Sequence, residues 1–233
     1  MLCTEEIVRA NIRNREGKRV YFLGKGDTLT PGARDYLTRE RIQIRPAEEA
    51  KMEEYRLLSG AVLREKPEQM THLHGNILVH KTHPRIAFRG AMDTLEGELL
   101  LSQLEVTGQL RQDLGEILDL ARRLIRCEVM EESLQPGLLC GLTEEEQRQH
   151  SHFPQKFYGQ SHFMPAVEDG VALLRINRAR CAARHAELTA AAAFQDRDGN
   201  PTRPDILRAL NRMSSMLWIL MIRLKKEINV TKQ

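Results

Sequence analysis

The chain has 233 residues, of which 41% are hydrophobic and 29% are charged, a composition typical of a globular protein with one or two domains. Its net charge is only +3 and it has a single tryptophan. This argues against a large nucleic-acid surface, which needs clustered cations or stacked aromatic rings. No apolar run approaches the roughly 20 residues that span a bilayer, so we expect neither nucleic acid nor a membrane as a partner.

The cysteine pattern and the N-terminus indicate the compartment. The four cysteines are far apart and have no CxxC spacing; they are Cys3, Cys127, Cys140 and Cys181. We therefore expect free thiols in a reducing environment. The N-terminus carries two early glutamates and lacks the basic-then-apolar layout of a signal peptide. The expected location is cytoplasmic.

Residues 1–50 predict a small βαβ-like unit. Residues 20–23 read as a strand, and the glycines after them predict a turn. Thr30 and Pro31 form an N-cap and first-turn pair for a helix that ends near residue 41. Residues 42–44 can return as a second strand.

The rest of the chain predicts a linker and a helical domain. Residues 51–69 are charged without a clear period, so we expect a linker there with a short helix over about 51–59. Residues 70–230 predict a helical bundle. The expected helices span about 86–106, 108–132, 166–195 and 203–227, with a shorter one opening at the capping box Thr143-x-x-Glu146. The expected fold is mainly α: a C-terminal five-helix bundle with the small N-terminal unit.

The last expected helix has the clearest apolar pattern. Steps of three and four residues join Leu210, Met213, Leu217, Leu220 and Leu224. Such a pattern predicts the buried seam of a bundle helix. Asn211 lies beside this seam, where its amide would make either a helix–helix or cap contact or a contact with a ligand.

A polar stripe marks the helix expected over residues 166–195. Arg180, Arg184 and Glu187 are spaced i, i+4 and i+7, so a helix places them on one side. Two interpretations fit the spacing. The stripe is either a solvated face with an Arg–Glu pair or a binding site for a polyphosphate, to which arginine offers planar, bidentate donors.

Three sequence blocks in fixed order carry a resemblance to a known family. The first is Met-Thr-His-Leu at 70–73 with the run at 81–93, the second is Phe-Met-Pro at 163–165 followed by the arginine stripe, and the third spans residues 203–215. Together they resemble the ATP:cob(I)alamin adenosyltransferases of the ethanolamine-utilisation type, which are related to the propanediol type. The resemblance covers about residues 70–228, and more loosely residues 30–33.

The resemblance implies a reaction and its partners. The 5′-deoxyadenosyl group of ATP would pass to the cobalt of cob(I)alamin, giving adenosylcobalamin for ethanolamine breakdown and releasing triphosphate. ATP, Mg²⁺ and the corrinoid are the implied substrates and cofactors. A homotrimer with ATP at its subunit interfaces is implied as well. A reductase, ethanolamine ammonia-lyase or its reactivase, and a bacterial microcompartment are candidate partners.

The same resemblance assigns roles to residues. Because cobalt is the nucleophile, the protein has to orient the substrates and stabilise the charge of the leaving triphosphate. The candidate catalytic cations are Lys81, Arg180 and Arg184. The candidate ATP-binding residues also include Thr71, Glu187 and Asn211. The candidate supporting residues are Gly90, Asp93 and Arg212.

The chain departs from the family pattern in two places. The glycine-rich ATP loop of the propanediol type is absent, and residues 71–79 take its place. The Cys-Cys-x-x-Cys metal motif of some ethanolamine-type members is absent too. The eight histidines have no carboxylate or cysteine at ligand spacing. We therefore expect no protein-bound metal centre.

Two alternatives stay open from the sequence. The family displaces the lower corrin ligand with apolar side chains, and the candidates here are Phe153, Phe157, Tyr158 and Phe163. Each of them also fits an ordinary core position. A non-enzymatic helical protein that docks a corrinoid enzyme or a microcompartment is the alternative function, but the intact cationic set favours the enzyme.

Overall fold

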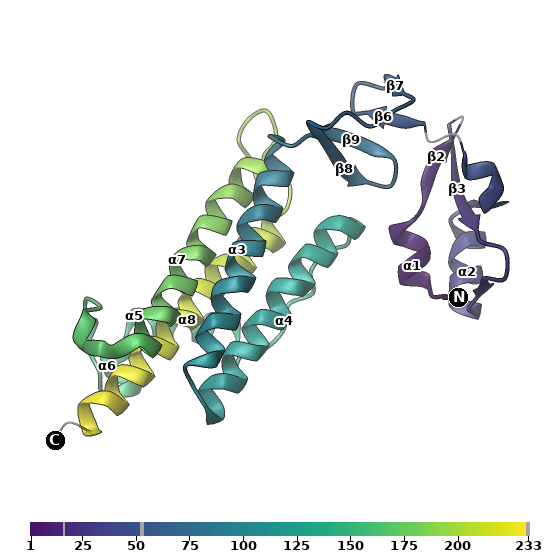
Figure 1. The fold of residues 1–233 in the computed structure, drawn as a ribbon. Helices are drawn as coiled ribbons and strands as arrows, with labels where there is room; N and C mark the ends of the chain where they lie inside the picture. The colour runs from purple at the N-terminus through teal and green to yellow at the C-terminus, as the bar shows by residue number, and fades with distance from the viewer. Residues whose placement is uncertain (16, 52–53, 232–233) are drawn as a thin grey trace. The chain divides into compact units, whose positions relative to one another are not determined.

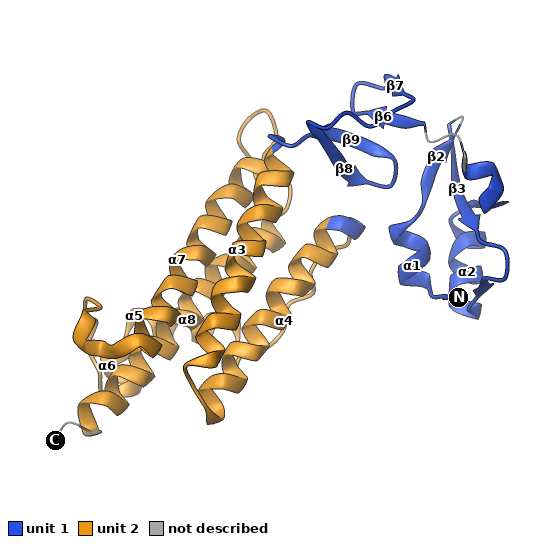
Figure 2. Ribbon diagram, in the orientation of Figure 1, with its two compact units in different colours: residues 1–83, 129–131 blue, residues 84–128, 132–233 orange. Residues whose placement is uncertain are grey.

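A computed structural model describes residues 1–15, 17–51 and 54–231 (Figure 1). The packing divides the chain into two compact units (Figure 2). The first comprises Met1–His83 with Val129–Glu131, and the second comprises Pro84–Glu128 with Glu132–Gln233. The named strands all belong to the first unit, and the second is helical. The mainly α fold is therefore confirmed, whereas the domain boundaries at residues 50 and 70 stay predictions.

The N-terminal part of the first unit contains the expected βαβ arrangement. Its elements are β1 (Leu2–Cys3), α1 (Glu5–Ala10), β2 (Arg13–Arg15), β3 (Lys18–Leu23), β4 (Thr28–Leu29), α2 (Pro31–Arg39), β5 (Gln43–Pro46) and the 3-10 turn η1 (Ala47–Lys51). Strands β3 and β5 pair in parallel, with Val20 opposite Gln43. The Thr30 hydroxyl accepts the Ala33 N–H at 3.2 Å, so the predicted N-cap of α2 is confirmed.

The short helix predicted over residues 51–59 was wrong. The segment instead contributes to a sheet of order β7-β6-β9-β8, made of β6 (Tyr55–Leu57), β7 (Val62–Leu63), β8 (Met70–His74) and β9 (Ile77–His80). Residues 52 and 53 lie outside the described part. Strand β6 pairs in parallel with β9, with Arg56 opposite Ile77. A local sequence window does not contain that partner, and strands this short show no clear alternation.

One buried amide links two of the three sheets described in the first unit, β2-β3-β5 and β7-β6-β9-β8. Asn76 is 1% exposed. Its Nδ2 donates to the carbonyl oxygens of Asn14 and Glu54, each at 2.9 Å, and its Oδ1 accepts the Asn14 N–H at 3.1 Å. A buried side-chain amide is stable only when it is hydrogen-bonded in this way.

Among the described residues, the second unit is a bundle of four long helices and two short ones. Its elements are α3 (Pro84–Leu104), α4 (Gly108–Met130), α5 (Glu144–His152), α6 (Pro154–Tyr158), the 3-10 turn η2 (Val167–Asp169), α7 (Gly170–Ala193) and α8 (Pro204–Thr231). The long helices run alongside one another, and α5 and α6 pack against α8 (Figure 1). The capping box at Thr143 is confirmed. Helix α7 begins later than expected, because Gly170 has φ +84° and η2 precedes it.

The buried residues of α7 and α8 determine where the polar stripe of Arg180, Arg184 and Glu187 lies. Helix α7 buries a row of mostly small residues, namely Leu173, Ile176, Ala179, Ala183, Ala186 and Ala190. On α8, the predicted seam is buried from Leu210 to Leu220. Arg180, Arg184 and Glu187 each directly follow an alanine of the buried row. The stripe therefore borders the core, next to α8.

Two charged residues of the third sequence block, Arg203 and Asp205, stabilise the start of α8. Arg203 donates from Nε and Nη2 to the two carboxylate oxygens of Asp205, at 3.0 and 2.8 Å. Arg203 Nη2 also donates to the Glu132 carbonyl oxygen at 2.7 Å, and the Leu134 N–H donates to Asp205 at 2.9 Å. The pair thus joins the loop after α4 to the beginning of α8.

Asp205 is expected to stabilise the protein in a pH-dependent way. Burial by itself raises the pKa of Asp205, but the hydrogen bonds from Arg203 and Leu134 lower it to about 2. Because this folded-state pKa lies below that of the unfolded chain, ~3.9, the stabilisation is present above about pH 4 to 5 and is lost as the pH falls to 2. Asp205→Asn should lower the free energy of unfolding by about 2 kcal/mol at pH 7.

Urea denaturation between pH 7 and pH 2 measures this effect. The difference between wild type and Asp205→Asn should shrink as the pH falls. Asp198→Asn, at an exposed position, is the control and should change stability by less than about 0.5 kcal/mol. An Asp205→Asn effect that stays constant down to pH 2 would contradict the assignment.

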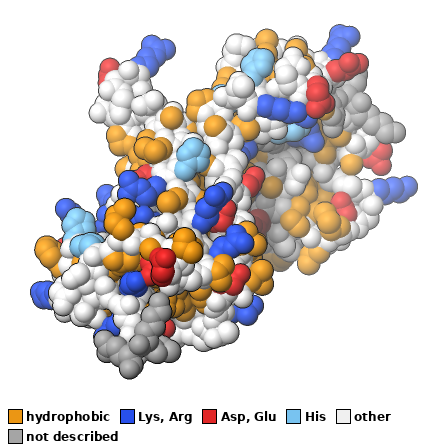
Figure 3. Space-filling view, turned by 60° about the vertical axis from the view of Figure 1, so that its left-hand side comes forward, with side chains coloured by type: hydrophobic (Ala, Val, Ile, Leu, Met, Phe, Trp, Pro, Cys, Tyr) orange, Lys and Arg blue, Asp and Glu red, His pale blue; other side chains and the backbone are white. Residues whose placement is uncertain are grey.

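Three structural features bear on the expected partners and thiols, and the absence of a nucleic-acid or membrane partner stays a prediction. No helix among the described residues is long and apolar enough to cross a membrane. All four cysteines are free thiols. On the face drawn in Figure 3, Lys and Arg side chains are scattered among hydrophobic and acidic ones. That face carries no continuous basic track of the kind that follows a nucleic-acid backbone.

Candidate functional site

A cavity of about 460 Å³ lies in the second unit beside α7 and α8. It is lined by Ser151, His152, His162, Arg180, Arg184, Asn211, Arg212, Ser214, Ser215 and Trp218. Three guanidiniums line it, and none of these ten residues is a carboxylate. Hydroxyl, imidazole and amide groups complete a polar wall. A cavity with this lining favours an anion.

Arg180 and Arg184 are available to a ligand. Among the described residues, neither guanidinium has a hydrogen-bond or ion-pair partner. Burial, and to a smaller extent the charge of Arg184, lower the pKa of Arg180; arginine nevertheless stays charged in proteins. Two neighbouring cations, one of them partly desolvated, are stabilised when an anion binds between them.

Glu187 does not form the ion pair that one interpretation of the spacing required. Within the described part of the chain, no salt bridge joins it to Arg180 or Arg184. Its Oε1 instead accepts Nδ2–H of Asn211 at 3.0 Å, while Asn211 Oδ1 accepts a hydrogen bond from Arg212. The Asn211 amide is thus held at both ends. It makes a helix–helix contact between α7 and α8 and also lines the cavity.

Trp218 lines the candidate site and was not predicted from the sequence. The Arg180 guanidinium carbon lies 5.1 Å from the centroid of the Trp218 ring. His162 and Phe163 stack on that ring, with centroids at 5.8 and 5.2 Å. The missed signal is spacing: Asn211, Ser214, Ser215 and Trp218 lie at i, i+3, i+4 and i+7, which is one side of a helix.

The other predicted site residues lie elsewhere. Thr71, in β8, and Lys81 belong to the first unit. Lys81 Nζ lies 3.1 Å from the Glu68 carboxylate at an exposed position. Gly90 and Asp93 are exposed on α3 and are not among the residues that line the cavity. The roles of these four residues stay predictions.

The four candidate aromatic residues have different surroundings. Phe153 is 61% exposed. Phe157 stacks on His150, with centroids 3.8 Å apart, and the Tyr158 hydroxyl lies 2.7 Å from His150 Nδ1. Phe163 contacts the cavity-lining Trp218. Which of them would face a corrin ring stays a prediction.

The histidines lining the cavity do not form a metal-binding cluster. His162 Nε2 lies 3.2 Å from the His152 carbonyl oxygen. Among the described residues, no group of three or more His, Cys, Asp or Glu side chains could hold a metal ion. The absence of a protein-bound metal centre stays a prediction.

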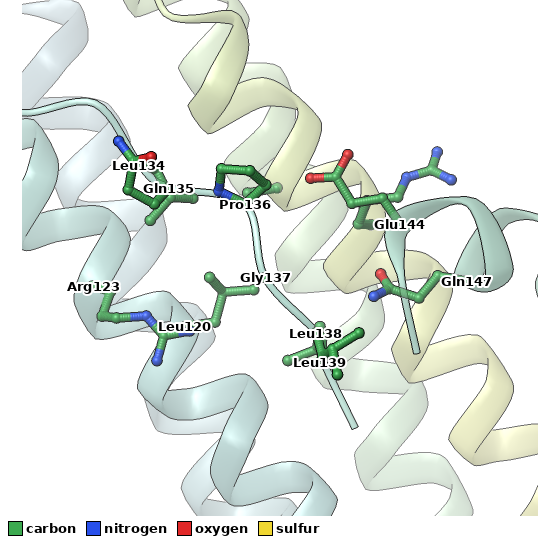
Figure 4. A pocket seen from close by; sticks show the side chains of 12 residues that line it. Leu120, Arg123, Leu134, Gln135, Pro136, Gly137, Leu138, Leu139, Glu144 and Gln147 are labelled. Carbon is green, nitrogen blue, oxygen red and sulfur yellow. The ribbon is translucent and has the colours of Figure 1, made fainter. Parts of the chain in front are cut away.

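A second, smaller cavity lies between α4, α5 and the segment after α4 (Figure 4). Its volume is about 50 Å³, and it shares Arg212 with the larger cavity. Gln147, which is 1% exposed, lines it, and its Oε1 has no hydrogen-bond partner among the described residues. A space of this size fits water molecules but excludes a nucleotide, so the larger cavity is the candidate site.

The fold and this cavity define a class: a helical-bundle protein with a cationic, anion-binding cavity beside two of its long helices. Comparison with known families narrows the class. The description of the matching family is cobalamin adenosyltransferase, and the match covers residues 61–224. The chain therefore belongs to the cobalamin adenosyltransferase family, as its sequence blocks predicted, and it is a transferase.

Two curated relatives are similar over nearly their whole length. The corrinoid adenosyltransferase EutT of Salmonella typhimurium is 29% identical over 242 residues, covering 94% of this chain and 90% of the relative. The corrinoid adenosyltransferase EutT of Escherichia coli K12 is 28% identical over 253 residues, covering 99% and 92%. These relatives do not favour the non-enzymatic alternative.

Proposed function

We propose that the protein transfers the 5′-deoxyadenosyl group of ATP to the reduced cobalt of a corrinoid. The cobalt electron pair would form the Co–C5′ bond. The C5′–O5′ bond would break, and its electrons would leave with the triphosphate. The observation that carries the proposal is a pair of guanidiniums on one cavity wall that have no hydrogen bond or ion pair among the described residues, in a chain of the cobalamin adenosyltransferase family.

Arg180 and Arg184 would act on the leaving group. Because the cobalt attacks, the protein needs no nucleophile of its own. What limits the reaction is the negative charge that grows on the triphosphate as the C5′–O5′ bond breaks. Fixed guanidiniums that meet this charge stabilise the transition state more than the ground state. Their i, i+4 spacing on α7 lets both contact one polyphosphate chain.

Glu187 and Asn211 would orient the nucleoside. Asn211 Nδ2 binds one oxygen of Glu187, so the carboxylate is held in one orientation. Its second oxygen is then suited to accept a hydrogen bond from a ribose hydroxyl. Asn211 also lines the cavity. One N–H of its Nδ2 is bonded to Glu187, and the other would donate to the adenine, the ribose or the phosphates.

The remaining site components belong to the proposal as well. Thr71 and Lys81 would contact the phosphates, and a homotrimer would place ATP at subunit interfaces, as the family resemblance implies. Mg²⁺ would be held by phosphate oxygens and water, because none of the residues that line the cavity is Asp or Glu. Gly90, Asp93 and Arg212 would support this arrangement.

The physiological setting is proposed from the relatives. Both are corrinoid adenosyltransferases designated EutT, and the sequence blocks resemble the ethanolamine-utilisation type. The product would serve ethanolamine breakdown in the cytoplasm. A reductase that supplies the electron, ethanolamine ammonia-lyase or its reactivase, and a microcompartment are the proposed partners.

Incubation of the full chain with ATP, Mg²⁺ and chemically reduced cobalamin tests the function. The expected result is the absorbance change to adenosylcobalamin, with one triphosphate released per product. A zinc-selective chelator should leave the rate unchanged, because the chain lacks the Cys-Cys-x-x-Cys motif. If no product forms at any protein concentration, the proposal is wrong; if the chelator inactivates the protein, a metal centre has been missed.

A further inference from the structure

We infer that Trp218 is a positioning residue that holds the Arg180 guanidinium toward the cavity. The inference rests on the proposed polyphosphate clamp and adds a residue to it. Trp218 and Arg180 come from different helices, α8 and α7, and both line the same cavity. The guanidinium carbon lies 5.1 Å from the ring centroid, within the range of a cation–π contact.

A cation–π contact is suited to orienting the Arg180 guanidinium while leaving it free to bind an anion. Arg180 has no hydrogen bond or ion pair within the described part of the chain, so the ring is the contact that orients its charge. A salt bridge would occupy N–H donors and neutralise the cation. A cation–π contact does not neutralise the cation and supplies no oxygen acceptor, so the N–H donors of the guanidinium stay available to phosphate oxygens.

The Trp218 ring is itself held by neighbouring aromatic side chains. Phe163 stacks on it at 5.2 Å and 23°, and His162 at 5.8 Å and 11°. Lys225 Nζ lies 5.5 Å from the Phe163 ring centroid and forms an ion pair with the buried Asp169. A continuous series of contacts thus runs from Asp169 to Arg180.

Without the Trp218 ring, we expect the Arg180 side chain to turn out of the cavity. Its neighbour Arg184 repels it, and burial disfavours its charge; both lower the pKa of Arg180. A flexible arginine side chain can relieve both by turning to solvent. The Trp218 contact opposes this movement, so that less side-chain freedom is lost when a polyphosphate binds.

Isothermal titration of inorganic tripolyphosphate into the full chain tests the role. Trp218→Leu should raise the dissociation constant about fivefold, the size of a partly buried cation–π contact. Trp218→Phe, which keeps an aromatic face, should raise it about twofold or less. The matched control is Phe22→Leu, which removes another ring beneath an arginine, since Arg15 lies 5.5 Å from the Phe22 centroid. It should leave tripolyphosphate affinity unchanged.

A double-variant comparison separates positioning from general packing. In an Arg180→Ala background, Trp218→Leu should have no further effect on tripolyphosphate affinity, because the residue it positions is gone. A purely structural role for Trp218 would weaken binding equally in both backgrounds. That outcome, or an unchanged dissociation constant in Trp218→Leu, would overturn the inference.

Fluorescence gives a readout that does not depend on replacing the tryptophan. Trp218 is the only tryptophan of the chain, so emission reports on it alone. Tripolyphosphate should change the emission of the wild type, with the same dissociation constant as the calorimetric titration, and should leave that of Arg180→Ala unchanged. Equal changes in both proteins would contradict the inference even if the Trp218 variants fail to fold.

The outcomes also distinguish this inference from the proposed function. If tripolyphosphate does not bind the wild type at all, the clamp is wrong and the role of Trp218 falls with it. If tripolyphosphate binds the wild type and Trp218→Leu equally well, only the role of Trp218 is overturned. The adenosyltransferase assay is independent of both results.

Discussion

Replacing both Arg180 and Arg184 by alanine should lower the rate of adenosyl transfer by at least about 100-fold, or about 2.7 kcal/mol of transition-state stabilisation. Each single alanine variant should lose at least about tenfold, or about 1.4 kcal/mol. Among the described residues neither guanidinium has a hydrogen bond or an ion pair, and both line one cavity. Steady-state measurement of kcat/KM with reduced cobalamin and ATP gives the numbers.

The matched control for the arginine variants is Arg208→Ala. Arg208 is an exposed arginine of α8 and does not line the cavity, so its loss should leave kcat/KM within about twofold of the wild type. If Arg180 and Arg184 contact the same triphosphate, their effects need not add. A double variant with full activity would place the phosphate clamp elsewhere.

Glu128→Leu should lower the free energy of unfolding by at least about 3 kcal/mol, because it leaves two arginines facing a buried site without their anion. The Glu128 side chain is 0% exposed and accepts from Arg85 Nε at 2.6 Å and from Arg89 Nε at 2.7 Å. Arg85 Nη2 also donates to the Glu128 carbonyl oxygen at 3.1 Å. This cluster joins the end of α4 to the start of α3.

Urea denaturation followed by circular dichroism measures the Glu128 effect. Glu96→Leu, the same substitution at a more exposed pair, is the matched control. The Glu96–Arg122 pair also joins α3 to α4, at 3.1 Å, but its arginine is 54% exposed, so the loss should be below about 1 kcal/mol. Equal losses in the two variants would show that burial of Glu128 contributes nothing beyond a surface pair.

The Glu128 cluster shows that cations of the first sequence block have different roles. That block contains Lys81, a proposed catalytic cation, together with Arg85 and Arg89. All three are cations within one short run. The structure shows that the two arginines bind a buried glutamate, so a family motif can mark a structural cluster as well as a site.

Local patterns predicted most of the fold. The Thr30 and Thr143 caps and the apolar seam of α8 use contacts within one or two helical turns. The sheet that contains β6 and β9 was missed, since its pairing joins residues far apart in the chain. The late start of α7 follows from Gly170, whose positive φ interrupts the helical path.

The candidate site, like the fold, was predicted from the sequence only in part. The sequence by itself determined that Arg180, Arg184 and Glu187 share one side of a helix, because helical spacing is a local property. It also determined the family, because the three blocks and their order can be read directly from the sequence. Only the tertiary structure decided that Glu187 binds Asn211 and that Arg180 lies over Trp218. Those contacts cross from α7 to α8, and packing between helices depends on the whole core, including the buried alanines of α7.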